Sequence, residues 1–92
     1  MNQHINQHIE QMPTVPGIEG DDLVTYWYEH LTPKAWANYR GLSQRTVAKH
    51  RSEGGGVPFV RVSARCIRYR RIDGYRHDQQ RLHNSTAEYE TV

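Results

Sequence analysis

The side chains of this sequence that are best suited to chemistry are cationic. All twelve Lys and Arg residues lie between Lys34 and Arg81, where only Glu53, Asp73 and Asp78 accompany them, so this stretch carries a net charge of +9. The whole-chain value of +2 conceals this concentration, because the other seven acids lie on either side of it. A folded block of such charge attracts polyanions, and nucleic acid is the first partner to consider.

The segment after Ser43 has the residue types that read base edges from a helix. Arginine can donate two parallel hydrogen bonds to guanine O6 and N7, and glutamine can pair in the same way with adenine. In a helix, Val47 faces inward with His50 beside it, and the first turn faces outward. Polar groups at a helix N-terminus also suit phosphate contacts. We predict DNA contacts from Ser43, Gln44, Arg45, Thr46 and Lys49.

A second cationic group lies in residues 57–70, whose pattern is typical of a β-hairpin with a turn at residues 63–65. Period-two alternation predicts an apolar face of Val60, Val62, Ile67 and Tyr69 and a cationic face of Arg61, Arg68 and Arg70. Arg65, in the turn, is placed for a narrow minor groove, and the other three arginines for phosphates. The alternative is a solvated sheet face, but arginines without acidic partners repel one another unless an anion binds.

Two helices joined by a short turn are predicted before this hairpin. Thr32 is a suitable N-cap, and Pro33 follows at the first helical position, where its missing N–H costs nothing. This helix should end at Gly41 in the left-handed conformation. Ser43 then caps a second helix that runs to about Glu53, and the short Gly-containing connection is typical of a helix-turn-helix.

The sequence therefore predicts an α+β fold, a small winged helix-turn-helix with two main helices, a two-stranded hairpin and a weak C-terminal helix. Asp73 should cap that last helix, with Tyr75 and Leu82 facing inward and Gly74 weakening its first turn. Leu42 should fill the angle between the main helices, and Phe59 should lie beneath them. The predicted core consists of Trp36, Ala37, Leu42, Val47, Phe59, Val60, Ile67 and Tyr69.

The flanks differ in composition from this domain, which we place at residues 22–83. Residues 1–21 are expected to form a disordered extension and residues 84–92 a flexible acidic tail. Residues 22–31 are apolar and aromatic, and periodicity does not decide between helix and extended chain. We expect them to pack across the helix that follows Thr32.

Several classes of function are disfavoured. A domain of this size leaves no room for an enzyme cleft, and no nucleophile–base–orienter set is evident, so we predict no catalytic residues. One cysteine, Cys66, rules out an internal disulfide or a Cys-based zinc site, and neither a metal nor a cofactor is expected. No apolar run reaches the roughly 20 residues of a membrane span, and no signal-peptide pattern follows Met1. We expect a cytoplasmic location.

The ordered set of residues resembles a known family. The Leu-Thr-Pro-Lys-Ala-Trp-Ala run from Leu31, the Gly-Leu-Ser turn from Gly41, the Gly-Gly-Gly-Val-Pro-Phe run from Gly54 and the Arg-Tyr-Arg end from Arg68 look like the MerR-like winged helix of excisionases. These proteins are also called recombination directionality factors, and AlpA-type phage regulators are similar. The resemblance covers about residues 31–75. Arg40 and His50 depart from it, standing where an apolar residue and a tryptophan are usual.

The resemblance implies a bacterial protein that binds double-stranded DNA without catalysis. Such proteins bind repeats in the attachment site of a mobile element, associate head to tail, bend the DNA and help an integrase, here expected to be a tyrosine recombinase, to excise the element. We expect the acidic tail around Glu88, Tyr89 and Glu90, or the N-terminal extension, to contact the next copy.

Two other readings stay open. The same domain suits a transcriptional regulator of prophage or integrative-element genes. An RNA-binding or protein-interaction module is less well supported, because the basic block lacks the exposed aromatic platform that single-stranded RNA recognition usually needs.

Overall fold

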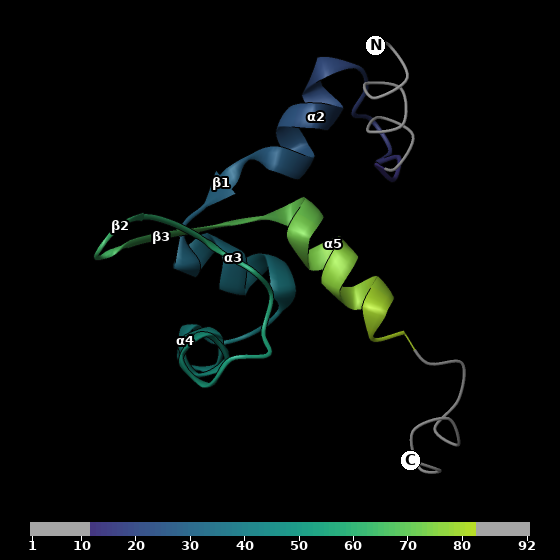
Figure 1. Ribbon diagram of the computed structural model, residues 1–92. Coiled ribbons are helices and arrows are strands. Elements are labelled where there is room, and N and C mark those ends of the chain that lie inside the picture. The colour runs from purple at the N-terminus through teal and green to yellow at the C-terminus, as the bar shows by residue number, and fades with distance from the viewer. Residues whose placement is uncertain (1–11, 83–92) are drawn as a thin grey trace, which may run out of the picture.

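The computed structural model describes residues 12–82 and places them in a small α+β domain with four helices and a three-stranded antiparallel sheet. Figure 1 shows the helices arranged around the sheet, with α2 and α4 on opposite sides of α3. In chain order the elements are α2 (Asp21–Tyr28), β1 (His30–Leu31), α3 (Pro33–Arg40), α4 (Gln44–Glu53), β2 (Val60–Ser63), β3 (Cys66–Arg70) and α5 (Arg71–Gln80).

The boundaries of α3 and α4 are the ones that the sequence predicts. Thr32 Oγ1 accepts a hydrogen bond from the Ala35 N–H at 3.1 Å, and Ser43 Oγ accepts one from the Thr46 N–H at 3.0 Å. Gly41 ends α3 with φ 71° and ψ 30°, a left-handed conformation that glycine adopts without a Cβ penalty. Both N-caps and the glycine stop are confirmed.

The sheet has the strand order β1-β3-β2, so the hairpin gains a third, short strand from the residues before α3. In the hairpin, Val60 pairs with Arg68 and Arg61 pairs with Ile67. Directly paired residues share a face, so the predicted alternation of β2 is wrong by one residue. Arg61 lies on the face of Ile67, opposite Arg68, and the predicted common cationic face of Arg61, Arg68 and Arg70 is not formed. Phe59 packs on the core, whereas Val62 is 60% exposed and Val60 is only half-buried.

One core cluster lies where α3, α4 and the sheet meet. Trp36, Ala37, Val47 and Tyr69 are all buried, as predicted, and Leu31 joins them. The indole of Trp36 stacks on the ring of Tyr69 with centroids 5.0 Å apart and planes 7° from parallel. Ile67 and Phe59 are partly buried against this cluster. Leu42 is not part of it, since it is 39% exposed, and its predicted place between the helices is wrong.

A second cluster joins the N-terminal residues to α5. Trp27 of α2 packs with Ile72, and Met12, only 5% exposed, completes the cluster. The Trp27 indole N–H donates to the Pro13 carbonyl at 2.9 Å. Two expectations are corrected by these contacts. Residues 12–21 belong to the packed structure rather than to a disordered extension, and α2 packs on α5 rather than across α3. Residues 1–11 and 83–92 lie outside the described residues.

The last helix begins earlier than predicted. Arg70 is its N-cap position and makes no side-chain cap hydrogen bond, while Asp73 lies in the first turn and does not cap the helix. Gly74 is buried against Trp36: a Cβ built on it would lie 2.6 Å from Cη2 of the indole. The glycine therefore permits the close approach of α5 to α3. Leu82 is 68% exposed and does not face inward.

Candidate nucleic-acid interface

The outward face of α4 is polar and carries two unpaired cations. Gln44, Arg45 and Lys49 are exposed, whereas Val47 on the opposite face is buried. No described carboxylate forms an ion pair with Arg45 or Lys49. This face can therefore offer two charges and an amide to an anionic surface without first breaking an ion pair.

The first turn of α4 is ordered by its own hydroxyl groups. Ser43 Oγ donates to Thr46 Oγ1 at 2.9 Å while it accepts the Thr46 N–H. Both residues lie at the N-terminal end of the helix, where the partial positive charge of the unpaired N–H groups attracts anions. Ser43 is exposed and Thr46 is half-buried, so the predicted phosphate contacts of this turn lie beside the exposed Gln44 and Arg45.

The hairpin carries three more arginines without a described carboxylate partner. Arg65 is exposed in the turn. The guanidinium of Arg61 donates to the Ala64 carbonyl at 3.1 Å, which folds the side chain along the turn. Arg68 is half-buried and donates to the Ile67 carbonyl at 2.9 Å. Both remain available to anions, because a guanidinium has five donors and each uses one here. Figure 1 shows the hairpin projecting past α3 on the side away from α5.

Arg70 is also a predicted DNA contact, but it does not belong to this group of arginines without a carboxylate partner. Its Nε and Nη2 donate to the two carboxylate oxygens of Asp73 at 2.7 and 3.0 Å, and its guanidinium lies 5.3 Å from the ring centroid of Tyr28. The hydrogen bonds to Asp73 are the main reason that the pKa of Arg70 is raised. This arginine joins β3, α2 and α5, and its charge is already neutralised.

None of the described ion pairs involves α4 or the hairpin turn, and the one hairpin arginine that is paired, Arg70, lies at the far end of β3. Arg40 of α3 makes two 2.8 Å hydrogen bonds with Asp78, and Arg71 pairs with Glu29 at 2.8 Å. Together with the Arg70–Asp73 pair, these two ion pairs involve three of the described acidic residues near the basic block. The described ion pairs thus lie where α5 meets α2, α3 and the end of β3, whereas the cations of α4 and the hairpin turn, like Arg76 and Arg81, have no described carboxylate partner.

Two residues that sequence reasoning missed hold the elements of this interface. Arg51, in the last turns of α4, donates from Nη1 to the Tyr69 hydroxyl at 3.0 Å and so ties α4 to β3. Arg40 lies 5.4 Å from the Trp36 ring centroid while it bonds Asp78, and it thereby takes the place of the apolar residue expected there. No local pattern signals either contact, since the partners lie 18 and 38 residues away.

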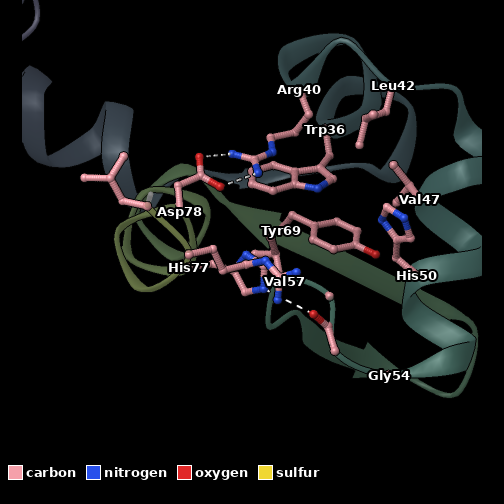
Figure 2. A pocket seen from close by; sticks show the side chains of 14 residues that line it. Trp36, Arg40, Leu42, Val47, His50, Gly54, Val57, Tyr69, His77 and Asp78 are labelled. Atoms are coloured by element: carbon pink, nitrogen blue, oxygen red, sulfur yellow. Dashed lines mark hydrogen bonds and ion pairs between the residues drawn. The ribbon is translucent and has the colours of Figure 1, made fainter. Parts of the chain in front are cut away.

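A pocket lies between α4 and α5 on the inward side of α4. We call it the α4–α5 pocket; it has a volume of about 520 Å³, and its lining includes Leu42, Val47, His50, residues 54–56 and Arg81. Figure 2 shows the stacked Trp36 and Tyr69 rings within it, with Arg40 and Asp78 bonded to each other at one side. His50 is exposed at this pocket, although the sequence predicted that it packs against Val47.

The described part of the chain offers little support for other kinds of site. Among residues 12–82, no group of three or more His, Cys, Asp or Glu side chains is arranged to hold a metal ion. No helix in this part is long and apolar enough to cross a membrane. The predicted contact residues Glu88, Tyr89 and Glu90 lie outside the described residues. No protein-family model, curated protein or solved structure matches the chain.

Proposed function

We propose that this protein binds double-stranded DNA as a winged helix-turn-helix, with α4 in the major groove and the hairpin turn along the adjacent minor groove. The observation that carries the proposal is that Arg45, Lys49, Arg61, Arg65 and Arg68, which lie on α4 and the hairpin, have no described carboxylate partner. A DNA backbone supplies the anions that this surface lacks.

Two roles are expected within the proposed interface, one on α4 and one on β3. Arg45 and Gln44 are exposed in the first turn, the part of a recognition helix that reaches base edges, and they should read sequence. Lys49 lies one turn further on and extends the same face. Arg68 is half-buried on β3 and should contact phosphates, which positions the domain without reading sequence.

The biological role that we propose is that of an excisionase. The family resemblance supports this role, as does the small size of the domain, because a single module buries only about 600–1,000 Å² of protein surface on DNA and binds weakly by itself. Occupancy of an attachment site would then depend on several copies bound to neighbouring repeats. Copies that associate head to tail form an open array rather than a closed dimer. Bound copies would bend the DNA and assist a tyrosine recombinase in excision.

The direct test is a footprint on attachment-site DNA at rising protein concentration, followed by an excision assay with the integrase. We expect protection that spreads in a regular period and excision that depends on the protein. Protection without any effect on excision would favour the transcriptional regulator instead. Absence of protection on any duplex in dilute buffer would refute DNA binding itself.

Two substitutions assign the roles of helix and hairpin. Arg45→Ala should reduce the preference for the target sequence, with about 1–3 kcal/mol of discrimination lost. Arg68→Ala should weaken binding to all sequences alike. Arg76→Ala is a matched control, because Arg76 is an exposed arginine on α5, outside the proposed surface. The opposite pattern for the first two variants would show that the reading helix and the hairpin are wrongly assigned.

A further inference from the structure

The α4–α5 pocket has an apolar floor of residues that are at most 4% exposed, so the apolar surface that it presents comes mainly from its edge. Val47 and the stacked pair Trp36 and Tyr69 line it from the core, and two exposed leucines lie at its edge. Leu42 is 39% exposed and Leu82 is 68% exposed, so both present apolar surface to solvent. A hollow of about 520 Å³ with both apolar and polar lining is in the size range of pockets that take a ligand group or an anchoring side chain.

The polar groups around the pocket have a positive bias. Its only described carboxylate is that of Asp78, which is neutralised by two 2.8 Å hydrogen bonds from Arg40. Arg81 lies at the same pocket and has no described ion-pair partner, and His50 and His77 add two imidazoles. An occupant that brings both apolar surface and carboxylates would therefore be complementary to it.

The backbone at the pocket suits an extended peptide. Residues 54–56 are three successive glycines; Gly54 and Gly55 are exposed, whereas Gly56 is half-buried against the side chain of His50. One of their carbonyls, that of Gly55, lies 3.2 Å from His77 Nε2, which fixes the loop against α5. The Gly54 N–H already donates to the His50 carbonyl at 3.1 Å, so main-chain hydrogen bonds to a peptide would use the other backbone groups of the exposed Gly54 and Gly55. Such bonds are the usual source of affinity in the recognition of extended peptides.

We propose that the α4–α5 pocket is the docking site for an acidic peptide segment of a partner protein, with one large apolar side chain inserted beside Leu42. Charge complementarity and the exposed leucines favour this occupant. The pocket lies on the inward side of α4, where Val47 is, and the proposed DNA contacts lie on the outward side, so DNA and the segment can be bound together. The inference concerns a different surface and does not depend on DNA binding.

The experiment is a titration of the isotope-labelled full chain with a short synthetic peptide that has a single tryptophan flanked by glutamates. NMR should show changes at the Trp36 indole N–H and at the amides of residues 54–56. A matched peptide with lysines in place of the glutamates should bind at least about tenfold more weakly, a difference of roughly 1.4 kcal/mol.

Two variants make the test specific. Leu42→Glu places a carboxylate at the edge of the pocket and should reduce the affinity for the acidic peptide at least about tenfold. Val24→Glu is the matched control, because Val24 is an equally exposed apolar residue on α2, away from the pocket, and should leave that affinity unchanged. Equal binding of the two peptides, or equal affinities of the two variants, would overturn the proposal.

Other occupants have their own signatures. If the chain self-associates without peptide or DNA and Leu42→Glu abolishes that association, a second copy occupies the pocket and the partner proposal is wrong. The DNA proposal is tested separately. A chain with Arg45→Ala and Lys49→Ala should lose DNA affinity and still bind the acidic peptide, so failure of either proposal is distinguishable from failure of the other.

Discussion

Gly74 is the position at which packing most clearly determines whether a substitution stabilises or destabilises the domain. Its backbone lies so close to Trp36 that an added Cβ would stand 2.6 Å from Cη2 and 3.3 Å from Cζ2 of the indole, with Arg40 Nη1 at 3.1 Å. The indole is only 2% exposed and is stacked on Tyr69, so it has little room to move. We predict that Gly74→Ala destabilises the domain, although alanine favours helix formation.

The expected magnitude follows from two opposing contributions. Alanine in place of glycine within a helix stabilises by about 1 kcal/mol. Inserting a methyl group into a close-packed contact costs about 1–3 kcal/mol, and this contact is shorter than real Cβ atoms tolerate. The net result should be a loss of about 1 kcal/mol, up to about 2. For a domain of this size that corresponds to a fall in Tm of several degrees.

Urea unfolding followed by circular dichroism measures this difference. Gln79→Ala is the matched control, because Gln79 lies on the same helix and is exposed, and its effect should stay within about 0.5 kcal/mol. If Gly74→Ala raised the free energy of unfolding by the full helix-propensity gain, the close contact between α5 and Trp36 would be refuted.

Two further predictions concern caps and pH. Ser43→Ala removes the hydrogen bond that Ser43 Oγ accepts from the Thr46 N–H and should lower the free energy of unfolding by about 1 kcal/mol in chemical denaturation; an unchanged value would argue against the cap. The hydrogen bonds from Arg40 hold the pKa of Asp78 below its ordinary value of 3.8, so their stabilisation is present above that pH and is lost as pH falls through the lowered pKa. Asp78→Asn should therefore reduce the loss of stability on acidification below pH 4, and an identical acid limb in both proteins would contradict the ion pair.

Local signals in the sequence were sufficient to predict the helices that position the site. A hydroxyl cap, a proline at the first helical position and a glycine stop each act within one turn, so α3 and α4 could be bounded without knowledge of the rest of the chain. The buried positions Trp36 and Val47 follow from the same helical spacing.

The strand register could not be predicted because the apolar alternation within β2 and the aromatic residue just before it favour opposite faces. Val60 and Val62 fit an inward alternation, whereas the opposite set holds Phe59, followed by the polar Arg61 and Ser63. A shift of one residue exchanges the faces, and the aromatic ring of Phe59, which packs near Tyr69 with centroids 6.0 Å apart, determines the outcome.

Roles that depend on where the next element of the fold begins also could not be predicted from local patterns. Arg70 continues the cationic pattern of β3, but the start of α5 brings the carboxylate of Asp73 to it. Asp73 itself has the residue type of a helix cap, and its place in the first turn became evident only from the start of α5 at Arg71. The loss of Arg70 from the predicted DNA contacts leaves the surface smaller and more confined to α4 and the hairpin turn.

The salt dependence of binding to duplex DNA tests the central claim most directly. If about six phosphates are neutralised, the affinity should fall roughly a thousandfold between 50 and 200 mM salt, and substitution of Arg68 by alanine should reduce the slope by about one contact. An affinity for duplex DNA that does not change with salt, or a slope that Arg68→Ala leaves intact while Arg76→Ala lowers it, would contradict binding through α4 and the hairpin.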